Sequence, residues 1–352
     1  MTEKTRIKVL VVDDSLFFRL KFSSAIGEDP EIEVVGAASS AIEAMQFIDQ
    51  FKPDVITLDV EMPHMSGIEF LKKLLPGRPL PVLVVSSRPE NAFDALEAGA
   101  LDFEKKPMVT SPADLAQFFE TLRSKIKAIH KSKVRQPRTA AEISSAAQGR
   151  AVPALPKVID SGLAVIAIGA STGGTDAIVQ VVKDLPPATP GIVIVQHMPA
   201  GFTKMYAERL NRVCRMSAKE AEDGDRVTTG AIIVGAGDYH LRLKLDSKGY
   251  YVRSQKGEKV SGHCPSVDVL FQSAAVEAGR HCIGVILTGM GADGAKGITQ
   301  LRQTGAYTIG QDQESCVVYG MPMEAYKMGG ISRQLPVSQI GREILQQLTK
   351  PR

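Results

Sequence analysis

The sequence contains no tryptophan, and aromatic residues make up only 5% of its 352 residues. Proteins that bind single-stranded nucleic acid use aromatic side chains as stacking surfaces, so this class is disfavoured. No apolar run approaches the roughly 20 residues that a transmembrane helix needs, and no apolar signal core follows Met1. The net charge of +3 is too small to indicate binding to nucleic acid or to a membrane surface. We therefore expect a soluble, cytoplasmic protein with no nucleic-acid partner and no membrane insertion.

Cysteine is also scarce in this chain. The four cysteines are widely spaced and form no Cys-x-x-Cys pair: Cys214, Cys264, Cys282 and Cys316. This spacing gives little support to a metal cluster or a disulfide scaffold. Reduced, mostly buried thiols are the expectation.

The length predicts about two domains, and the first third of the chain alternates apolar runs with amphipathic stretches. Runs rich in β-branched residues, without polar alternation, are typical of strands buried in a parallel sheet. The expected strands are Ile7–Val12, Val34–Ala38, Asp54–Leu58, Val82–Ser86 and Leu101–Phe103. The expected helices are Leu16–Ile26, Ala41–Phe51, Gly67–Leu75, Asn91–Ala98 and Ala113–Ile129. This pattern predicts an N-terminal α/β domain of (βα)5 type over residues 5–128.

A change of composition follows this domain. Residues 129–160 are rich in basic and small residues and lack apolar periodicity, which indicates a flexible linker. A nucleic-acid-binding arm is the weaker alternative, since the charge density is modest. The β–α pattern resumes over residues 161–350 and predicts a doubly wound, mostly parallel α/β domain. Tyr239–Leu245 and Tyr250–Arg253 predict a small antiparallel hairpin within it.

Acidic side chains follow two of the expected strands of the first domain. Asp13 and Asp14 follow the first strand, and Asp59 follows the third. The carboxyl ends of parallel strands meet at one crevice, where these carboxylates would repel each other without a cation. Oxygen ligands of this kind favour Mg²⁺. Ser86 and Lys106, at two further strand ends, can hold and neutralise a phosphoryl group. A lone Asp after a strand is usually a helix N-cap, but five suitable positions favour a pocket.

Four segments carry a resemblance to the receiver domain of bacterial response regulators: VVDDS at 11–15, LDVEMPHMSG at 58–67, VVSS at 84–87 and KKP at 105–107. The resemblance implies that Asp59 takes a phosphoryl group from a histidine kinase and binds Mg²⁺ together with Asp13 and Asp14. It also implies that Ser86 and Lys106 are the switch hydroxyl and lysine. Ser86 replaces the commoner threonine, and Phe103 stands where the aromatic switch residue is often tyrosine.

A Gly-x-Ser-x-Gly motif, Gly169–Gly173, lies between an expected strand and an expected helix. Small flanking residues permit a sharp turn that presents the hydroxyl of Ser171, and the helix start supplies N–H groups for an oxyanion. Two alternatives stand beside this interpretation. The turn resembles phosphate-binding loops of nucleotide sites, although it does not fit Gly-x-Gly-x-x-Gly. A helix N-cap is the second alternative for Ser171, and the motif alone favours neither this role nor that of a nucleophile.

His197 follows the next expected strand and is the candidate base for Ser171. His240 and His263 are interpreted as solvated surface histidines, with a substrate contact as the alternative. Asp293 follows a third strand and is the candidate for orienting the imidazole, the alternative being an N-cap of the helix expected at Gly294–Gln303. The N–H of Met290 in the same loop is a candidate oxyanion donor.

Five segments resemble the catalytic domain of protein-glutamate methylesterases of bacterial chemotaxis: AIGASTGGT at 167–175, QHMPAGFT at 196–203, PSVDVLF at 265–271, LTGMGADG at 287–294 and YGMP at 319–322. The resemblance implies a Ser171–His197–Asp293 triad with backbone oxyanion donors at Thr172 and Met290. It implies a γ-glutamyl methyl ester on a methyl-accepting chemotaxis receptor as substrate, with glutamine deamidation as a second activity. No cofactor is expected for the hydrolysis itself. The alternative function is a response regulator whose second domain binds a nucleotide or a protein partner without catalysis.

Overall fold

The computed structural model describes residues 6–107, 111–132 and 164–350. The chain divides into two compact units, residues 1–152 and 153–352. The predicted linker, residues 129–160, lies outside the described residues apart from 129–132, where Ile129 is the last residue of a helix.

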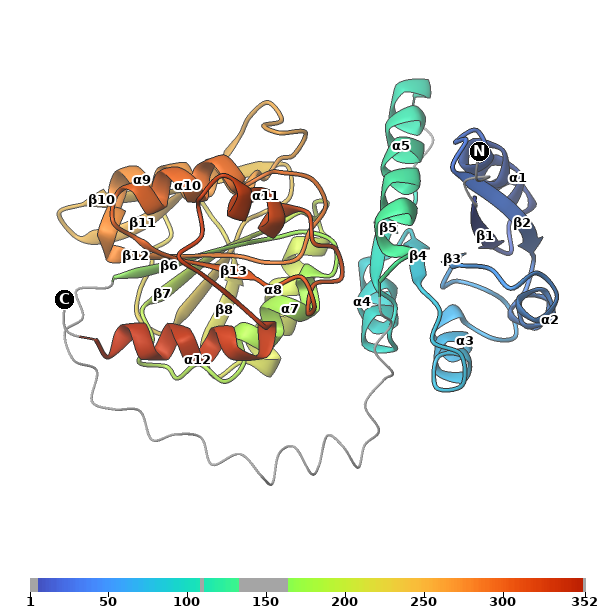
Figure 1. Cartoon of the computed structure of the whole chain (residues 1–352), viewed down its shortest axis with the longest axis horizontal. Coiled ribbons are helices and arrows are strands. Elements are labelled where there is room, and N and C mark those ends of the chain that lie inside the picture. Colours follow the sequence, from blue (N-terminus) through green and yellow to red (C-terminus); the bar gives the residue numbers. More distant parts are fainter. Residues whose placement is uncertain (1–5, 108–110, 133–163, 351–352) are drawn as a thin grey trace. The chain divides into compact units, whose positions relative to one another are not determined.

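A five-stranded parallel sheet forms the centre of the N-terminal unit, in the order β2-β1-β3-β4-β5 (Figure 1). Its strands are β1 (Ile7–Val12), β2 (Ile32–Ala38), β3 (Val55–Leu58), β4 (Val82–Ser86) and β5 (Asp102–Lys105). Its helices are α1 (Leu16–Gly27), α2 (Ala41–Phe51), α3 (Gly67–Leu74), α4 (Pro89–Glu97) and α5 (Pro112–Ile129). Contacts join α1 to α5 and α3 to both α2 and α4, so helices cover both faces. The predicted (βα)5 fold is confirmed, and its strand order reverses between β1 and β3, where such sheets form their ligand sites.

A seven-stranded parallel sheet forms the centre of the C-terminal unit, in the order β14-β13-β12-β6-β7-β9-β8. Its strands are β6 (Val165–Ala170), β7 (Gly191–Gln196), β8 (Ser217–Glu220), β9 (Ala231–Val234), β12 (Cys282–Ile286), β13 (Tyr307–Gln311) and β14 (Arg333–Leu335). The chain first builds outward from β6 to the β8 edge and later adds β12 on the other side of β6. The direction of winding therefore reverses beside β6, which confirms the predicted doubly wound sheet.

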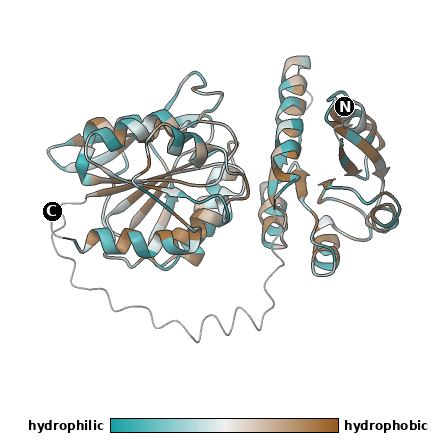
Figure 2. Cartoon of the chain, viewed as in Figure 1, coloured by the Kyte–Doolittle hydropathy of each residue, from teal (hydrophilic) through white to brown (hydrophobic). Residues whose placement is uncertain are grey.

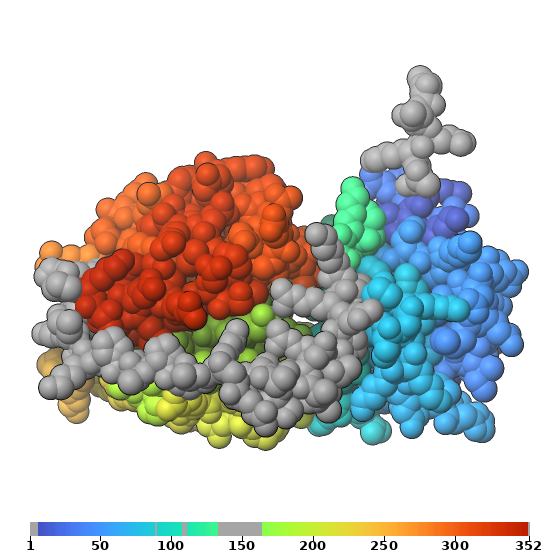
Figure 3. Space-filling model, turned by 60° about the horizontal axis from the view of Figure 1, so that its bottom comes forward, coloured from blue at the N-terminus to red at the C-terminus, as the bar shows by residue number. Residues whose placement is uncertain are grey.

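Helices form a layer on each side of this sheet (Figure 1). One layer joins α9 (Val267–Glu277), α10 (Ala295–Gln303) and α11 (Met321–Lys327), and the other joins α7 (Gly174–Val182), α8 (Phe202–Val213) and α12 (Val337–Leu348). In the space-filling view the C-terminal residues, in red, lie against green residues of the same unit, in keeping with the contact between α12 and α7 (Figure 3). The predicted hairpin is confirmed as β10 (Tyr239–Asp246) and β11 (Gly249–Lys256), which pair antiparallel.

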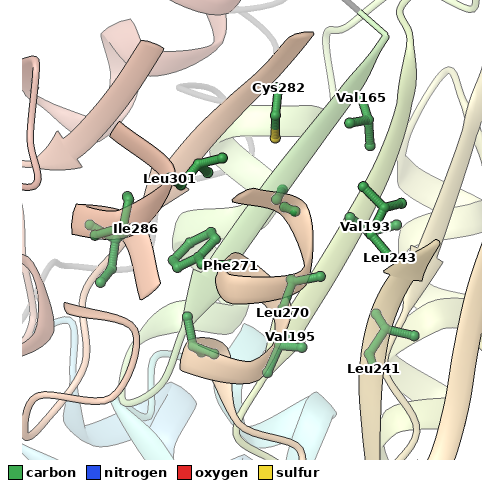
Figure 4. Packing of buried hydrophobic residues seen from close by; sticks show 14 of the residues in the cluster. Val165, Val193, Val195, Leu241, Leu243, Leu270, Phe271, Cys282, Ile286 and Leu301 are labelled. Carbon is green, nitrogen blue, oxygen red and sulfur yellow. The ribbon is translucent and has the colours of Figure 1, made fainter. Parts of the chain in front are cut away.

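The core of the C-terminal unit lies between the sheet, α9, α10 and the hairpin. Hydrophobic residues colour the central strands almost continuously, whereas the helices alternate between polar and apolar residues (Figure 2). A close view shows buried side chains of the sheet gathered with those of α9 and the hairpin: Val165, Val193, Val195, Cys282, Leu270, Phe271, Leu241 and Leu243 (Figure 4). Burying each such side chain contributes about 1.5–3 kcal/mol. No helix in the described part of the chain combines the length and hydrophobicity needed to cross a membrane.

Three elements of this unit, besides the 3₁₀ turn Gly279–His281, have no counterpart in the sequence-based expectations. Strand β8 consists of small and polar residues at the sheet edge, β14 has three residues, and α11 has seven. Elements this short complete at most two full periods, so their patterns carry little signal. Packing against the sheet defines them instead.

Candidate active site and phosphorylation site

The acidic residues of the N-terminal unit meet at the carboxyl end of its sheet. Asp13 and Asp59 are buried and Asp14 is exposed, and one oxygen of each lies within 4.8 Å of the others. Lys106 follows β5 and reaches into the same place, where its Nζ lies 2.8 Å from Asp13 Oδ2 and forms an ion pair with Asp59. The four side chains that the sequence places at three strand ends are thus brought together.

Charge in this pocket is unbalanced among the described residues. Burial raises the pKa of both Asp13 and Asp59, against the opposing effect of Lys106. Burial lowers the pKa of Lys106, but hydrogen bonds to Asp13 and Asp59 outweigh it, and the net shift is upward. One ammonium therefore faces two buried carboxylates and the nearby Asp14. An all-oxygen donor set with excess negative charge fits Mg²⁺.

The predicted switch residues lie on neighbouring strands. Ser86 is fully buried at the end of β4, and its Oγ donates a hydrogen bond to Arg88 O at 3.2 Å. Phe103 lies within β5 and is 5% exposed, with its ring 5.9 Å from that of Phe93 in α4. Ser86 ends β4, which lies between the strands that precede Asp59 (β3) and Lys106 (β5), and Phe103 lies on β5 itself.

In the C-terminal unit, Ser171 directly follows β6 in a tight turn. Its N–H donates to Thr288 O at 3.0 Å, and its carbonyl accepts from Gly174 N at 2.7 Å and from Gln196 Nε2 at 2.9 Å. Gly173 adopts a left-handed conformation (φ +73°) and is the N-cap of α7, without a side-chain cap bond. Ser171 is therefore not the N-cap of α7, and the N-cap alternative for this residue is wrong.

The glycines of this turn make room for protein side chains. A Cβ at Gly173 would lie 2.5 Å from the Val317 side chain, and one at Gly174 would lie 2.1 Å from Gln196 Oε1. In a phosphate-binding loop, glycines let the backbone approach the ligand instead. The glycines of this turn therefore do not support the nucleotide-binding alternative.

His197 and Asp293 come together as the sequence predicts. Ser171 and His197 follow residues that pair directly across β6 and β7, Ala170 and Gln196. His197 Nε2 lies 2.7 Å from Asp293 Oδ2, and a carboxylate only accepts, so this nitrogen carries the proton. His197 Nδ1 is buried and has no hydrogen-bond partner among the described residues. Nδ1 is therefore the nitrogen of the imidazole that can accept a proton.

Asp293 is held by another helix and not by the one that follows it. Gly294 is the N-cap of α10 and no side-chain cap bond forms there, so the N-cap alternative for Asp293 is wrong. Its carboxylate instead accepts hydrogen bonds from His197 and from Ser266, Val267 and Asp268 at the start of α9. Burial raises the pKa of Asp293, but the hydrogen bonds from His197, Ser266 and Val267 outweigh it and hold the pKa below its usual value.

The interpretation as a solvated surface residue is wrong for His240, whereas His263 is partly exposed and borders the site. His240 is 1% exposed and bonds to Glu258 O through Nε2 at 2.8 Å. The His263 ring stacks on His197, with the ring centroids 3.7 Å apart and the planes inclined by 10°. The turn that carries His263 folds back from the hairpin onto the site, a long-range contact that gives no signal in local sequence.

The loop after β12 approaches Ser171 closely at Gly289. A Cβ at this position would lie 2.8 Å from Ser171 Cβ and 2.3 Å from Met321 Sδ. The Gly289 carbonyl accepts from the N–H groups of Gly320 and Met321, so the YGMP segment holds this loop in place. The N–H groups of Thr172 and Met290 donate to no acceptor among the described residues. Both N–H groups that the sequence suggests as oxyanion donors thus carry no other hydrogen bond in the described part of the chain.

We expect Gly289→Ala to lower the turnover number by at least tenfold while the protein remains folded. The added methyl group must displace Ser171 or Met321, and small displacements of reacting groups can cost about a hundredfold in rate. The measurement is ester hydrolysis with a thermal melt beside it. Gly77→Ala, at an exposed position with no atom within 4 Å of the added Cβ and no left-handed φ, is the control for glycine replacement. Unchanged turnover in Gly289→Ala would contradict the close approach.

Both units of the chain match families of known proteins. Residues 166–344 match the family model described as CheB methylesterase, and residues 9–119 match the response regulator receiver domain. A protein-glutamate methylesterase/protein-glutamine glutaminase of Syntrophomonas wolfei is 51% identical over 339 residues, 96% of this chain and 97% of its own. One from Pectobacterium atrosepticum is 45% identical over 349 residues, 98% of each chain. The catalytic domain of Thermotoga maritima CheB methylesterase is 37% identical with a TM-score of 0.51, covering 52% of this chain and 98% of that one.

Proposed function

Because the chain belongs to the family of protein-glutamate methylesterases/protein-glutamine glutaminases, we propose that it is a phosphorylation-activated serine hydrolase of chemotaxis receptors. It removes methyl groups from glutamyl side chains and deamidates specific glutamines, which gives sensory adaptation. One observation carries the catalytic assignment. His197, bonded to Asp293 through Nε2, keeps a buried Nδ1 without a partner among the described residues, beside the strand end that presents Ser171.

The first half of the reaction forms an acyl-enzyme. Ser171 Oγ attacks the ester carbonyl while His197 Nδ1 takes its proton. Asp293, ionised and fixed by its hydrogen bonds, stabilises the imidazolium that results. The backbone N–H groups of Thr172 and Met290 hold the oxyanion of the tetrahedral intermediate, a type of contact that often contributes several kcal/mol.

Methanol then leaves with the proton from His197, which completes the acyl-enzyme. In the second half, a water molecule gives a proton to His197 and attacks the acyl carbonyl. The bond to Ser171 Oγ breaks, and Oγ takes the proton back from His197. The same sequence on a glutamine side chain releases ammonia in place of methanol. No organic cofactor or metal is part of this scheme.

The N-terminal unit controls the hydrolase through phosphorylation. Asp59 accepts the phosphoryl group from a histidine kinase of chemotaxis, and Asp13 and Asp14 bind Mg²⁺ with it. The metal, when bound, offsets the charge of the phosphoryl oxygens. Lys106 neutralises a further oxygen of the phosphoryl group. The Ser86 hydroxyl turns toward the phosphoryl oxygens, and the Phe103 ring then moves in the same direction. These events take place in the cytoplasm, where such kinases act.

The test of the function is methanol release from methylated receptor membranes, with and without a small phosphoryl donor such as acetyl phosphate. Release that increases with the donor supports the proposal. A protein that releases neither methanol nor ammonia under either condition would refute it.

Asp59→Asn is expected to remove the response to the phosphoryl donor and to leave the unphosphorylated rate of methanol release as it is. The amide cannot form the acyl phosphate, and Asp59 lies in the other unit from Ser171. Asp54→Asn is the matched control, because Asp54 precedes the same strand at its opposite end and bonds to Lys8 N. Activation that persists in Asp59→Asn, with incorporated phosphate measured by mass spectrometry, would place the acceptor elsewhere.

A further inference from the structure

Two buried aspartates lie at the starts of two helices that pack on each other. Asp268 is in the first turn of α9, and Asp293 precedes α10. The helices come close because residue 297 is glycine; a Cβ there would lie 2.7 Å from Asp268 O. Neither Asp268 nor Ser266, the residue before α9, has a role in the scheme above.

Asp293 receives three hydrogen bonds from the start of α9. Ser266 Oγ donates to Oδ1 at 2.7 Å, the Val267 N–H to Oδ2 at 2.7 Å and the Asp268 N–H to Oδ1 at 3.1 Å. The N–H groups of a first helical turn also present the positive end of the helix dipole to a carboxylate. Each oxygen of Asp293 therefore has two donors, since His197 Nε2 donates to Oδ2.

Asp268 makes the reciprocal contact with α10. Its Oδ1 accepts from the N–H of Gly297, in the first turn of α10, at 2.7 Å. Its Oδ2 accepts from Ser261 Oγ at 3.2 Å, in the turn that carries His263. The start of α9 is thus bonded to Asp293, and the start of α10 is bonded to Asp268. Together these bonds fix the distance between Asp293 and α9.

Ser266 itself is fixed by a third element. Its N–H donates to His240 Nδ1 at 3.3 Å, and His240 is anchored by its bond to Glu258 O. Ser266 is fully buried and Asp268 is 2% exposed, so neither side chain is placed to touch a receptor helix.

We propose that Ser266 and Asp268 are positioning residues of the hydrolysis, which act through Asp293 by holding the starts of α9 and α10 together. The proposal rests on the proposed function. Without the Ser266 hydroxyl, Oδ1 of Asp293 keeps one donor and the carboxylate can turn away from His197. The proton transfer at His197 Nδ1 then slows, whereas substrate binding does not change.

Ser266→Ala is expected to lower kcat for methanol release by about tenfold with KM unchanged, because hydrogen bonds to charged groups contribute roughly tenfold or more in an equilibrium. Ser273→Ala is the matched control. Ser273 is a hydroxyl of the same helix that bonds to Leu243 N and Leu270 O and does not touch Asp293. Should Ser266→Ala fail to fold, Ser266→Gly retains a favoured N-cap residue and lacks the same hydroxyl.

A double-mutant cycle separates positioning from a loss of structure. In the Asp293→Asn background, Ser266→Ala should lower kcat by less than twofold, because the group through which it acts has already been replaced. A merely structural role would give the same loss in both backgrounds. Asp268→Asn, which keeps an acceptor for Gly297, should retain kcat within about twofold, whereas Asp268→Ala should lose about tenfold.

Wild-type kcat in Ser266→Ala, an increase in KM in place of the loss of kcat, or equal losses in the two backgrounds would overturn the proposal. The rate at which a fluorophosphonate labels Ser171 is the second measurement, and it needs no receptor. A wild-type protein that is labelled but releases no methanol would refute the proposed substrate, while the labelling rate of Ser266→Ala still tests the positioning role.

Discussion

Replacement of Ser171 by alanine is expected to reduce methanol release by a factor on the order of 10⁴ to 10⁶ without unfolding the protein. The hydrogen bonds that hold Ser171 in its turn run through its backbone and survive in alanine. What disappears is the only hydroxyl that is placed, in the proposed scheme, next to both a base and the free N–H groups of Thr172 and Met290.

The measurement is methanol release from methylated receptors, with circular dichroism and thermal melting to verify the fold. Ser217→Ala, which removes a hydroxyl from the exposed edge strand β8, is the control for loss of a serine. If a folded Ser171→Ala protein retained more than a few per cent of the wild-type rate, Ser171 would be a structural residue and another nucleophile would have to be sought.

The second large effect separates His197 from Asp293. We expect His197→Ala to be as damaging as Ser171→Ala, because His197 is the group that takes the proton of Ser171 in the proposed scheme. Asp293→Asn should retain about ten- to a hundredfold more activity than His197→Ala, since loss of the orienting residue costs less than loss of the base.

The reason for the remaining loss in Asp293→Asn lies in the donors around the carboxylate. All four partners of Asp293 donate, so the amide group of asparagine must face at least one donor. Where the amide faces His197, it donates to Nε2 and leaves the proton on Nδ1, which is then no longer a base. Comparison of the pH dependence of kcat in the two variants tests this, because only Asp293→Asn keeps the imidazole of His197. If a His197→Ala protein stayed active and lost this activity when His263 was also replaced, the base would be His263.

Much of the site was predictable because parallel sheets gather their functional residues at strand ends. Four site residues directly follow buried strands: Asp13, Asp59, Ser171 and His197. The end of a buried strand can be predicted from the sequence. The packing of Gly289 against Ser171 and the stacking of His263 on His197 could not be predicted in this way. Both contacts join residues that are far apart in the chain, and neither leaves a periodic pattern.

Two α/β units, most of their strands and helices, and the side chains at the strand ends could be predicted from the sequence. Those properties follow from local hydrophobic periodicity and from short motifs, which need no knowledge of distant contacts. Which side chains cap helices and which are free to react depends instead on tertiary packing. Gly173 is the N-cap of α7, and Gly294 is the N-cap of α10. Ser171 therefore caps no helix, and Asp293 bonds to α9 and to His197. The physical reason is that a polar group in a buried site takes whichever partners packing brings to it, and packing brings together the starts of helices that the sequence keeps apart.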